Sequence, residues 1–413
     1  MLSPEENSML TRVGPGTPAG GFLRCYWQPA ALSEDFPTGG APQPVRLLGE
    51  DLVLFRDEEG QPGLLGIHCA HRGADLSYGR IEAGGLRCIY HGWLYDVDGR
   101  CVEQPGEPVG STFHERIRQR SYPCLDVGGL ILCYMGLGEP PLLPAYEFLA
   151  VPPDQARTSK VLQECNYQQG GEGNIDPVHH SFLHLRFGRS EDDRMSFYGQ
   201  DPTPTIDPEE TDFGVRVYAV RRLAEGRNYV KITNFILPSL YAVTGDANGY
   251  SINWHVPIDD VTHWKYQVVF RRNSAPPRRD GGSRSATGYL AVRNRGNRYM
   301  QDRDEMKAKT FSGLGMDFQA EDGCVTEGSG PIQDRAKENA AYTDRAIVAA
   351  RAVLLRGIRA VQSGAEAPHV VREPALNHFP NIGAAKDVIP SEIPWRGYWE
   401  NETALRENLI AHV

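Results

Sequence analysis

Two short segments of the chain combine cysteine with histidine at spacings that suit an iron–sulfur cluster. The first pairs Cys69 with His71, and the second pairs Cys88 with His91. Two thiolates on one iron and two neutral imidazoles on the other form a Rieske-type 2Fe-2S cluster, with a reduction potential of roughly −150 to +300 mV. We predict that these four residues hold such a cluster. The alternative is a zinc site, but zinc fingers usually pair their cysteines, and the Cys-x-His spacing fits that pattern less well.

The two loops that would carry these ligands read CAHRGA and CIYHGW. Neither loop contains a further cysteine, so we predict that no disulfide supports the cluster and that its potential lies in the lower part of the range. Gly73 and Gly92 follow the histidines, and they would let the backbone turn close to the sulfur atoms.

A second concentration of possible metal ligands lies between residues 172 and 184. It contains three histidines and two carboxylates, namely Glu172, Asp176, His179, His180 and His184. Two histidines and one carboxylate form the facial triad of non-haem Fe(II) oxygenases, which leaves coordination positions open for oxygen. Such an iron pairs sensibly with a Rieske cluster, because oxygen activation needs electrons that are delivered singly. We predict a mononuclear Fe(II) site here.

The residues alone leave the ligand set of this iron open. On a regular helix His180 and His184 share a face better than His179 and His184 do. The carboxylate must come from later in the chain, and periodicity does not choose among the candidates, which are Asp317, Glu321, Asp322 and Glu327.

The elements that must position these residues change character along the chain. Short β-type runs separated by turn signals extend over 45–96, and a further hairpin is expected over 121–135. A proline-rich connector follows at 140–153. We predict three parts, which are an N-terminal segment at 1–24, a Rieske 2Fe-2S domain at 25–148 and a catalytic mononuclear iron domain at 149–413.

The catalytic part combines helices with a larger sheet. We expect a helical segment through 160–187 and a strong amphipathic helix at 343–362. The polar segment 276–285 is expected to be a solvated hairpin tip. The fold class is therefore α+β, with an antiparallel β Rieske domain and a catalytic domain of helices and one antiparallel sheet. The expected strands of that sheet are 213–222, 228–237, 249–257 and 262–272.

Composition limits the classes of function. The 413 residues are 40% hydrophobic and 23% charged, which suits two ordinary globular domains. A formal net charge of −10 argues against binding to nucleic acid, which needs clustered positive charge. No secretory signal or membrane-spanning run is recognised. The chain has eight cysteines, and their spacing does not suggest a disulfide framework. Because disulfides are rare in the reducing cytoplasm, we expect a cytoplasmic protein.

Together the two ligand motifs make the chain resemble the oxygenase component of a Rieske non-haem iron oxygenase. The resemblance is to the phthalate dioxygenase type of the aromatic ring-hydroxylating oxygenases. It covers nearly the whole chain, and it includes the segments 5–18, 69–91, 176–184, 300–313 and 330–332. It implies a Rieske domain followed by a larger helix-grip (START-like) catalytic domain.

The resemblance also implies site residues. The family pattern Asp-x2-His-x4-His gives His179 and His184 as imidazole ligands, with His180 as the alternative to His179. Asp176 stands three residues before the first ligand, where its carboxylate can orient that imidazole. The ligand aspartate of the family stands three residues before a valine and five before a glutamate, which points to Asp322.

The implied activity is that of a terminal oxygenase. It would use O2 to hydroxylate, dihydroxylate or O-demethylate an aromatic substrate, such as an aromatic acid or an aryl ether. No Gly-x-Gly-x-x-Gly fingerprint is evident, so a separate flavin and iron–sulfur reductase would oxidise NAD(P)H. The family also implies trimers or stacked trimers, in which Asp176 bridges His179 to His91 of the neighbouring subunit.

Other functions stay open on the sequence. The main alternative within the class is a tailoring oxygenase that acts on a non-aromatic or heterocyclic biosynthetic substrate. Outside this class, the chain could carry electrons without oxygen chemistry. A helix-grip cavity could also bind a ligand without turnover.

Overall fold

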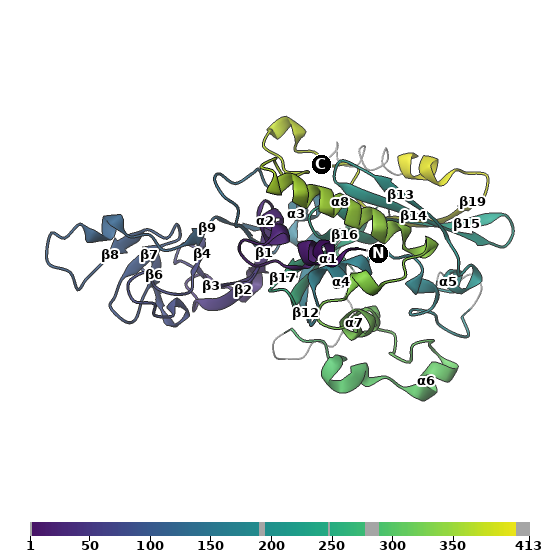
Figure 1. Ribbon diagram of the computed structural model, residues 1–413, viewed down its shortest axis with the longest axis horizontal. Helices are drawn as coiled ribbons and strands as arrows, with labels where there is room; N and C mark the ends of the chain where they lie inside the picture. Colours follow the sequence, from purple (N-terminus) through teal and green to yellow (C-terminus); the bar gives the residue numbers. More distant parts are fainter. Residues whose placement is uncertain (1, 190–194, 247, 277–288, 402–413) are drawn as a thin grey trace.

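The computed structural model describes residues 2–189, 195–246, 248–276 and 289–401. The molecule is elongated, with a small β domain at one end and a larger body of helices and sheet at the other (Figure 1). Helices α1 (Pro4–Thr11) and α2 (Pro18–Arg24) belong to the body, where both pack against α8 (Arg345–Gln362). The predicted hairpin tip at 276–285 lies, except for its first residue, outside the described residues.

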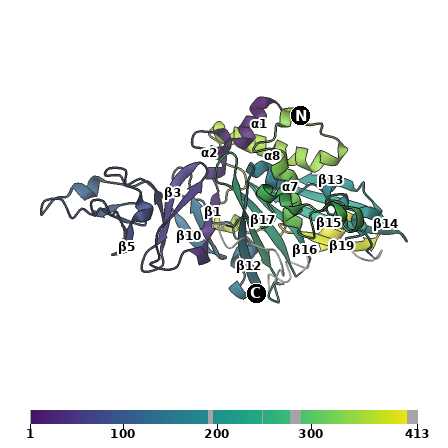
Figure 2. The same ribbon diagram turned by 90° about the horizontal axis from the view of Figure 1, so that it is seen from below.

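The small domain contains three antiparallel sheets, with strand orders β2-β3-β4-β9, β5-β6-β7-β8 and β1-β11-β10. Figure 2 shows it projecting from the body. The strands predicted over 45–96 and the hairpin over 121–135 are confirmed. The bounds are β1 (Trp27–Leu32), β2 (Gln43–Leu47), β3 (Glu50–Arg56), β4 (Pro62–Gly66), β5 (Arg80–Glu82), β6 (Gly85–Arg87), β7 (Leu94–Asp96), β8 (Cys101–Glu103), β9 (Ser121–Tyr122), β10 (Cys124–Val127) and β11 (Leu130–Tyr134).

One eight-stranded antiparallel sheet forms the centre of the body, in the order β12-β18-β17-β16-β15-β14-β13, and β19 pairs with β15. Helix α8 packs on β13 and β14 (Figure 1). The bounds are β12 (Ala156–Gln163), β13 (Thr205–Glu210), β14 (Gly214–Leu223), β15 (Arg227–Ile236), β16 (Leu240–Asp246), β17 (Gly249–Pro257), β18 (His263–Phe270) and β19 (Ala385–Pro390). The shorter helices are α3 (Glu147–Ala150), α4 (Tyr167–Glu172), α5 (Phe197–Gln200), α6 (Arg303–Ala308) and α7 (Phe318–Gly328).

The prediction of a helical segment through 160–187 is wrong. Residues 160–163 belong to β12, because this strand pairs with β18 along its whole length. Helical structure is limited to α4 and the short 3-10 helix η5 (His179–Ser181). Helix α4 lies very close to the sheet, since a Cβ atom on Gly171 would come within 2.4 Å of the Tyr241 hydroxyl. The sequence signal for a helix was thus overridden by pairing within the sheet.

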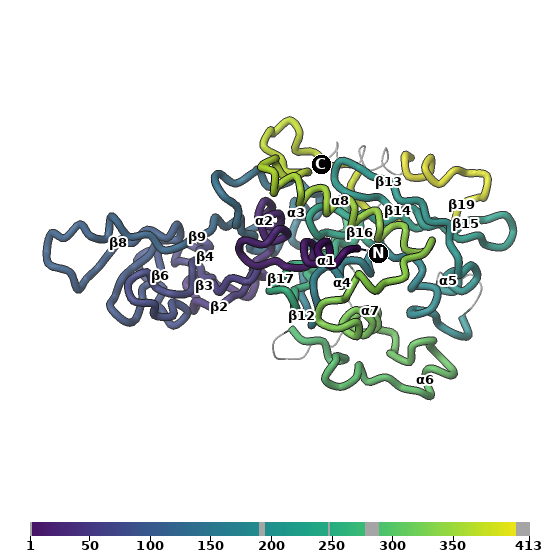
Figure 3. Tube along the Cα trace, in the orientation of Figure 1, coloured from purple at the N-terminus to yellow at the C-terminus, as the bar shows by residue number. Residues whose placement is uncertain are grey.

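The small domain and the body share a hydrophobic core. Leu54 of β3 and Leu132 of β11 belong to the same buried cluster as Trp254 of β17 and Tyr266 of β18. The trace in Figure 3 follows the chain from the body into the small domain and back. Over the described ranges, no helix combines the length and the apolar character needed to cross a membrane.

Candidate metal centres and adjacent cavities

The two predicted cluster loops have the same backbone design. In each loop the cysteine amide donates to the carbonyl five residues later, and the glycine amide donates back to the cysteine carbonyl, at distances of 2.8 to 3.0 Å. Gly73 and Gly92 have φ angles of 74° and 75°, in the left-handed region that glycine tolerates without strain. The loops therefore present Cys69 and Cys88 in equivalent positions.

The side chains of these loops form one donor set. The Cys69 and Cys88 side chains are buried, and the rings of His71 and His91 lie beside each other with centroids 4.5 Å apart. The buried Nδ1 atom of His71 has no hydrogen-bond partner in the protein. Burial, together with the neighbouring Cys69, raises the pKa of the Cys88 thiol, and a bound cation would favour its thiolate form. Two thiolates and two imidazoles in this arrangement fit a Rieske cluster.

The surroundings of the cluster loops were not predicted. The Tyr95 hydroxyl lies 3.1 Å from the Cys69 sulfur, and the His71 ring stacks on Trp93 with centroids 4.2 Å apart. Hydrogen bonds to the sulfur atoms are one of the means by which a protein sets the potential of such a cluster. Ile89 and Tyr90 are exposed, so the second loop offers an apolar surface next to His91. All eight cysteines of the chain are free thiols.

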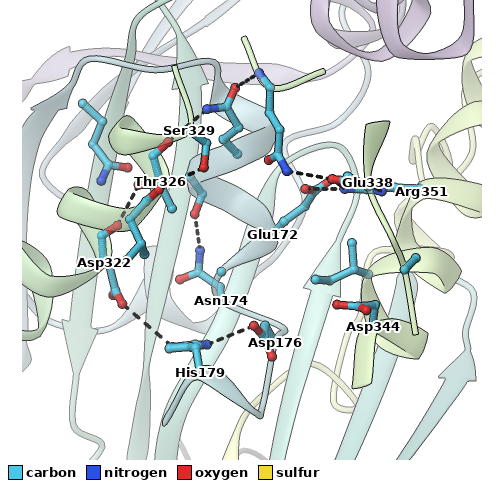
Figure 4. Close-up of a pocket in the computed structure, with 18 of the residues that line it drawn as sticks. Glu172, Asn174, Asp176, His179, Asp322, Thr326, Ser329, Glu338, Asp344 and Arg351 are labelled. Carbon is cyan, nitrogen blue, oxygen red and sulfur yellow. Dashed lines mark hydrogen bonds and ion pairs between the residues drawn. The ribbon is translucent and has the colours of Figure 1, made fainter. Parts of the chain in front are cut away.

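His179, His184 and Asp322 meet around one point. His179 opens η5, His184 follows η5 in the chain, and Asp322 stands on α7. The Asp322 Oδ1 atom lies 3.1 Å from Nε2 of His184 and 3.8 Å from Nε2 of His179. Figure 4 shows the side chains of Asp322 and His179 pointing toward each other. Two imidazole nitrogens and one carboxylate oxygen this close together match the two-histidine, one-carboxylate donor set that binds Fe(II) and leaves coordination positions open.

Glu321, the neighbour of Asp322 on α7, contacts the other ring nitrogen of His184. Its carboxylate is fully buried and lies 2.9 Å from Nδ1 of His184. Arg186 donates to both carboxylate oxygens, at 2.8 and 2.6 Å, and Ser312 donates at 2.6 Å. Burial raises the pKa of Glu321, but the hydrogen bonds from His184, Arg186 and Ser312 lower it below its ordinary value. A charged Glu321 therefore holds the His184 ring with Nε2 toward Asp322.

Asp176 lies beside His179, as the sequence spacing predicts. The Asp176 Oδ2 atom is 3.5 Å from Nδ1 of His179, and the contact is drawn in Figure 4. The turn that carries His179 is also held by Arg221, a fully buried residue. Arg221 donates to the Pro177 carbonyl at 2.6 Å and to the Ser181 hydroxyl at 3.1 Å. No sequence signal pointed to Arg221.

His180 occupies a different environment from His179. The ligand-capable nitrogens of His179, His180 and His184 all lie within 4.8 Å of one another, so distance alone does not separate them. The Nε2 atom of His180, however, lies 2.8 Å from the Lys231 ammonium. Burial, together with the charges of other cationic side chains, lowers the pKa of Lys231 to about 7. This contact engages one of the two ring nitrogens with which His180 could bind a metal.

Two cavities adjoin these residues. The larger has a volume of about 460 Å³, is lined by His179, His184 and Asp322, and extends over the inner face of the sheet. Ligand pockets typically fall between roughly 300 and 1,000 Å³. The smaller, of about 360 Å³, lies around Asp176 and is drawn in Figure 4. Asn174 lines both cavities, as do His179 and Asp322, so the candidate iron site has space on two sides.

Comparison with known proteins identifies the two parts of the chain. The profile of the Rieske [2Fe-2S] domain matches residues 26–123, and the profile described as LigXa C-terminal domain like matches residues 133–410. The phthalate 4,5-dioxygenase oxygenase subunit of Pseudomonas putida is 34% identical over 426 residues, covering 96% of this chain and 95% of that protein. The chain belongs to the Rieske non-haem iron oxygenases. Its cofactors are accordingly a 2Fe-2S cluster and a mononuclear iron.

Further relatives of this Rieske oxygenase extend the comparison. The 5,5'-dehydrodivanillate O-demethylase oxygenase subunit of a Sphingobium species is 33% identical, covering 91% of this chain and 85% of that protein. The 3-chlorobenzoate-3,4-dioxygenase oxygenase subunit of Comamonas testosteroni is 30% identical, covering 97% and 98%. The solved terminal oxygenase of carbazole 1,9a-dioxygenase from Novosphingobium sp. KA1 superimposes with a TM-score of 0.59 at 21% identity, covering 87% and 96%. The family and fold class predicted from the sequence are confirmed.

Proposed function

We propose that this Rieske oxygenase is the terminal component of a system that uses O2 to hydroxylate, dihydroxylate or O-demethylate an aromatic substrate. The observation that carries the proposal is the position of Asp322, which faces His179 and His184 in the lining of the 460 Å³ cavity. A space of ligand size thus adjoins a donor set that leaves positions open for oxygen. The relatives named for phthalate, chlorobenzoate and dehydrodivanillate support an aromatic substrate, such as an acid or an aryl ether.

In this proposal His179, His184 and Asp322 are the iron ligands, and the iron they hold supplies the capacity to activate O2. Glu321 accepts a hydrogen bond from Nδ1 of His184, which fixes the tautomer with Nε2 free to bind the metal. Asp176 is placed to do the same for His179, although its 3.5 Å separation is long for a hydrogen bond. The cavity beyond these residues holds the substrate next to the open positions.

Electrons enter this scheme from outside the chain. Cys69, His71, Cys88 and His91 hold the 2Fe-2S cluster in our proposal, and a separate NAD(P)H-dependent flavin and iron–sulfur reductase reduces it. The solved oxygenase of carbazole 1,9a-dioxygenase is described in complex with a ferredoxin, which supports a separate electron-transfer protein. None of the eight cysteines forms a disulfide, which suits the reducing cytoplasm, where we place the system.

We also propose a homotrimer or a stack of trimers, in which the cluster of one subunit serves the iron of the next. Asp176 then links His179 to His91 of the neighbouring subunit. This part of the proposal rests on the family resemblance and on the position of Asp176 in the lining of the smaller cavity.

The proposal is tested by iron content and by oxygen uptake. An oxygenase of this kind should contain about three iron atoms per chain, two in the cluster and one mononuclear. With a reductase and NADH, oxygen uptake should depend on an added aromatic substrate and should yield a hydroxylated or demethylated product. Iron near two per chain would indicate an electron carrier. Substrate binding without any oxygen uptake, in protein with full iron content, would indicate a binding protein.

A further inference from the structure

Three imidazoles, and not two, stand at the proposed iron site. The ligand-capable nitrogens of His179, His180 and His184 all lie within 4.8 Å of one another. Imidazole suits iron as well as zinc, and three histidines are a known donor set for zinc. A third histidine on the iron would also fill a position that the two-histidine, one-carboxylate set leaves open. A two-histidine site at this place therefore requires that one of the rings be kept from the metal.

The partner behind each ring distinguishes the three histidines. A neutral imidazole has one nitrogen that carries the proton and one that offers a lone pair. The partner of His184 is the Glu321 carboxylate, 2.9 Å from Nδ1. A carboxylate only accepts hydrogen bonds, so it holds the proton on Nδ1 and leaves the lone pair of Nε2 for a metal. Asp176 stands in the same relation to Nδ1 of His179, at 3.5 Å.

His180 has the opposite kind of partner. Its Nε2 atom lies 2.8 Å from the ammonium group of Lys231, which can only donate hydrogen bonds. The Nε2 atom must therefore accept, and the proton of the neutral ring then stands on Nδ1. That Nδ1 atom is buried and has no hydrogen-bond partner within the described residues. Neither nitrogen of His180 keeps a free lone pair, so the ring cannot bind a metal while Lys231 holds it.

The surroundings of His180 fix the ring in this orientation. The ring stacks on that of Tyr198, with centroids 5.0 Å apart and planes 28° apart. The guanidinium of Arg221 lies over the same Tyr198 ring, 4.9 Å from its centroid. Arg221 also hydrogen-bonds to Pro177 and to Ser181, on either side of the two histidines. His180 cannot turn toward the metal without losing its contacts with Tyr198 and the lysine.

The fold alone does not account for Lys231. Only 8% of its surface is exposed, and it forms no ion pair with a carboxylate in the part of the chain that the structure describes. Burying an ammonium group without such a partner costs free energy of folding. A hydrogen bond to a neutral imidazole offsets this cost only in part. The cost points to a function for the contact between Lys231 and His180.

We propose that Lys231 is a positioning residue that excludes His180 from the iron and so fixes a site of two histidines and one carboxylate. Carboxylates behind His179 and His184 leave these rings free to bind, whereas the amine behind His180 engages its lone pair. The inference rests on the ligand set of the proposed function. It deepens that proposal by naming the residue that selects between two neighbouring histidines.

The test asks whether the release of His180 restores a site that has lost His179. Competition with a chelator under anaerobic conditions measures the affinity for Fe(II) without any turnover. His179→Ala should lose the mononuclear iron. The double variant His179→Ala/Lys231→Met should bind iron at least about tenfold more tightly than the single variant, because His180 can then supply the second imidazole. A merely structural role of Lys231 predicts no such gain, since a further loss of support cannot improve binding.

Three further changes in the His179→Ala background serve as matched controls. Lys231→Arg keeps a hydrogen-bond donor at the His180 ring and should give no recovery of iron binding. Lys160→Met removes another largely buried lysine of the same sheet, which pairs with Asp35 at 2.9 Å, and it should give no recovery either. Adding His180→Ala to the double variant should abolish the recovery, because the replacement ligand is then missing.

Three results would overturn the inference. The first is equal iron affinity of the single and the double variant, with both shown to be folded by circular dichroism. The second is a recovery that survives His180→Ala. The third is weaker iron binding when Lys231→Met is made in the otherwise unchanged protein, which would make Lys231 a support of the ligands. If Lys231→Met does not fold, Lys231→Leu provides the same test.

These outcomes are distinct from those that test the proposed function. Substrate-dependent oxygen uptake by the unchanged protein tests that function. A protein that binds iron and shows the recovery, but takes up no oxygen, would support the role of Lys231 and reject the proposed function. Normal oxygen uptake without the recovery would do the opposite.

Discussion

The Rieske loops take their four proposed ligands from one stretch of chain, residues 69–91, whereas the catalytic site takes two from a single turn and a third from helix α7. His184 and the Glu321 that orients it are 137 residues apart in sequence. The two sites also differ in burial. Tyr90, next to His91 in the cluster loop, is 56% exposed, while the His184 side chain is 1% exposed and Glu321 is fully buried.

This contrast reflects the two tasks. A cluster that exchanges electrons with other proteins benefits from a histidine near the surface, and two hairpin loops suffice to build it. A site that binds O2 and a substrate needs a cavity and precisely oriented ligands. The structure provides a cavity of about 460 Å³ and a His184 ring held by the buried Glu321, which Arg186 holds in turn. Changes in the catalytic site should therefore leave the cluster intact, and the following predictions test that independence.

The largest effect is expected from the neighbouring histidines. His179→Ala should lose the mononuclear iron, and its substrate-dependent oxygen uptake should fall by at least about 100-fold. Removing a group that only orients a metal ligand typically costs roughly 10- to 100-fold, and removing the ligand itself should cost more. The Rieske absorption should be unchanged. His180→Ala should keep both metals, since His180 contacts Lys231. Iron analysis together with the visible spectrum decides the matter, and the opposite pattern would transfer the ligand role to His180.

Asp176→Asn should separate electron transfer from metal binding. The proposed ligands are untouched, so both metals should stay bound, but oxidation of the prereduced cluster in a single turnover with substrate should slow by about 10- to 100-fold. The alternative is that Asp176 only stabilises its turn, where Oδ1 accepts the Val178 amide at 2.8 Å. Asparagine can accept the same hydrogen bond, so a near-native rate in the variant would reject the bridging role.

Glu321→Gln should weaken the mononuclear site by a smaller factor. The amide keeps the shape but loses the charge that holds His184 and Arg186, and we expect about a tenfold loss of iron affinity, measured by competition with a chelator. Glu327→Gln is the matched control on the same helix. Glu327 is also buried, but it pairs with Tyr299 and contacts neither histidine, so its replacement should not change iron affinity. Equal losses in both variants would argue for a general effect on α7.

The smallest effect on activity is expected from replacement of Glu172, which should change the free energy of unfolding instead. Glu172 is buried between Arg335 and Arg351, and although burial raises its pKa, the two arginines lower the pKa to about 2. Because the folded pKa lies below the unfolded value, the stabilisation is complete above about pH 4.5 and is lost as the pH falls toward 2. Linkage gives roughly 3 kcal/mol for this loss.

Denaturant unfolding at several pH values measures this contribution. The free energy of unfolding should fall between pH 4.5 and 2 more steeply in the native protein than in Glu172→Gln, which has no carboxylate to protonate there. Parallel slopes in the two proteins would contradict the assignment.

The parts of the molecule that could be predicted from the sequence are those held together by contacts between residues close in the sequence. The strands of the small domain and helix α8 follow local patterns, and the structure contains them. The continuous helix expected through 160–187 is limited to α4 and η5, and residues 160–163 join strand β12, which gains a full ladder with β18 that no local pattern reveals. The contact between Lys231 and His180 was likewise hidden, because the two residues are 51 positions apart in sequence and lie on different elements.

The sequence by itself determined which donor atoms the protein offers and, through short spacings, which of them lie together in each loop. It narrowed the acidic ligand to a few residues around α7, and the family pattern selected Asp322. Only the tertiary structure decided that Asp322 faces Nε2 of both histidines while the adjacent Glu321 faces Nδ1 of His184. Successive residues of a helix point about 100° apart, so two neighbouring carboxylates reach opposite sides of one imidazole ring only when the helix is packed against it at the correct rotation.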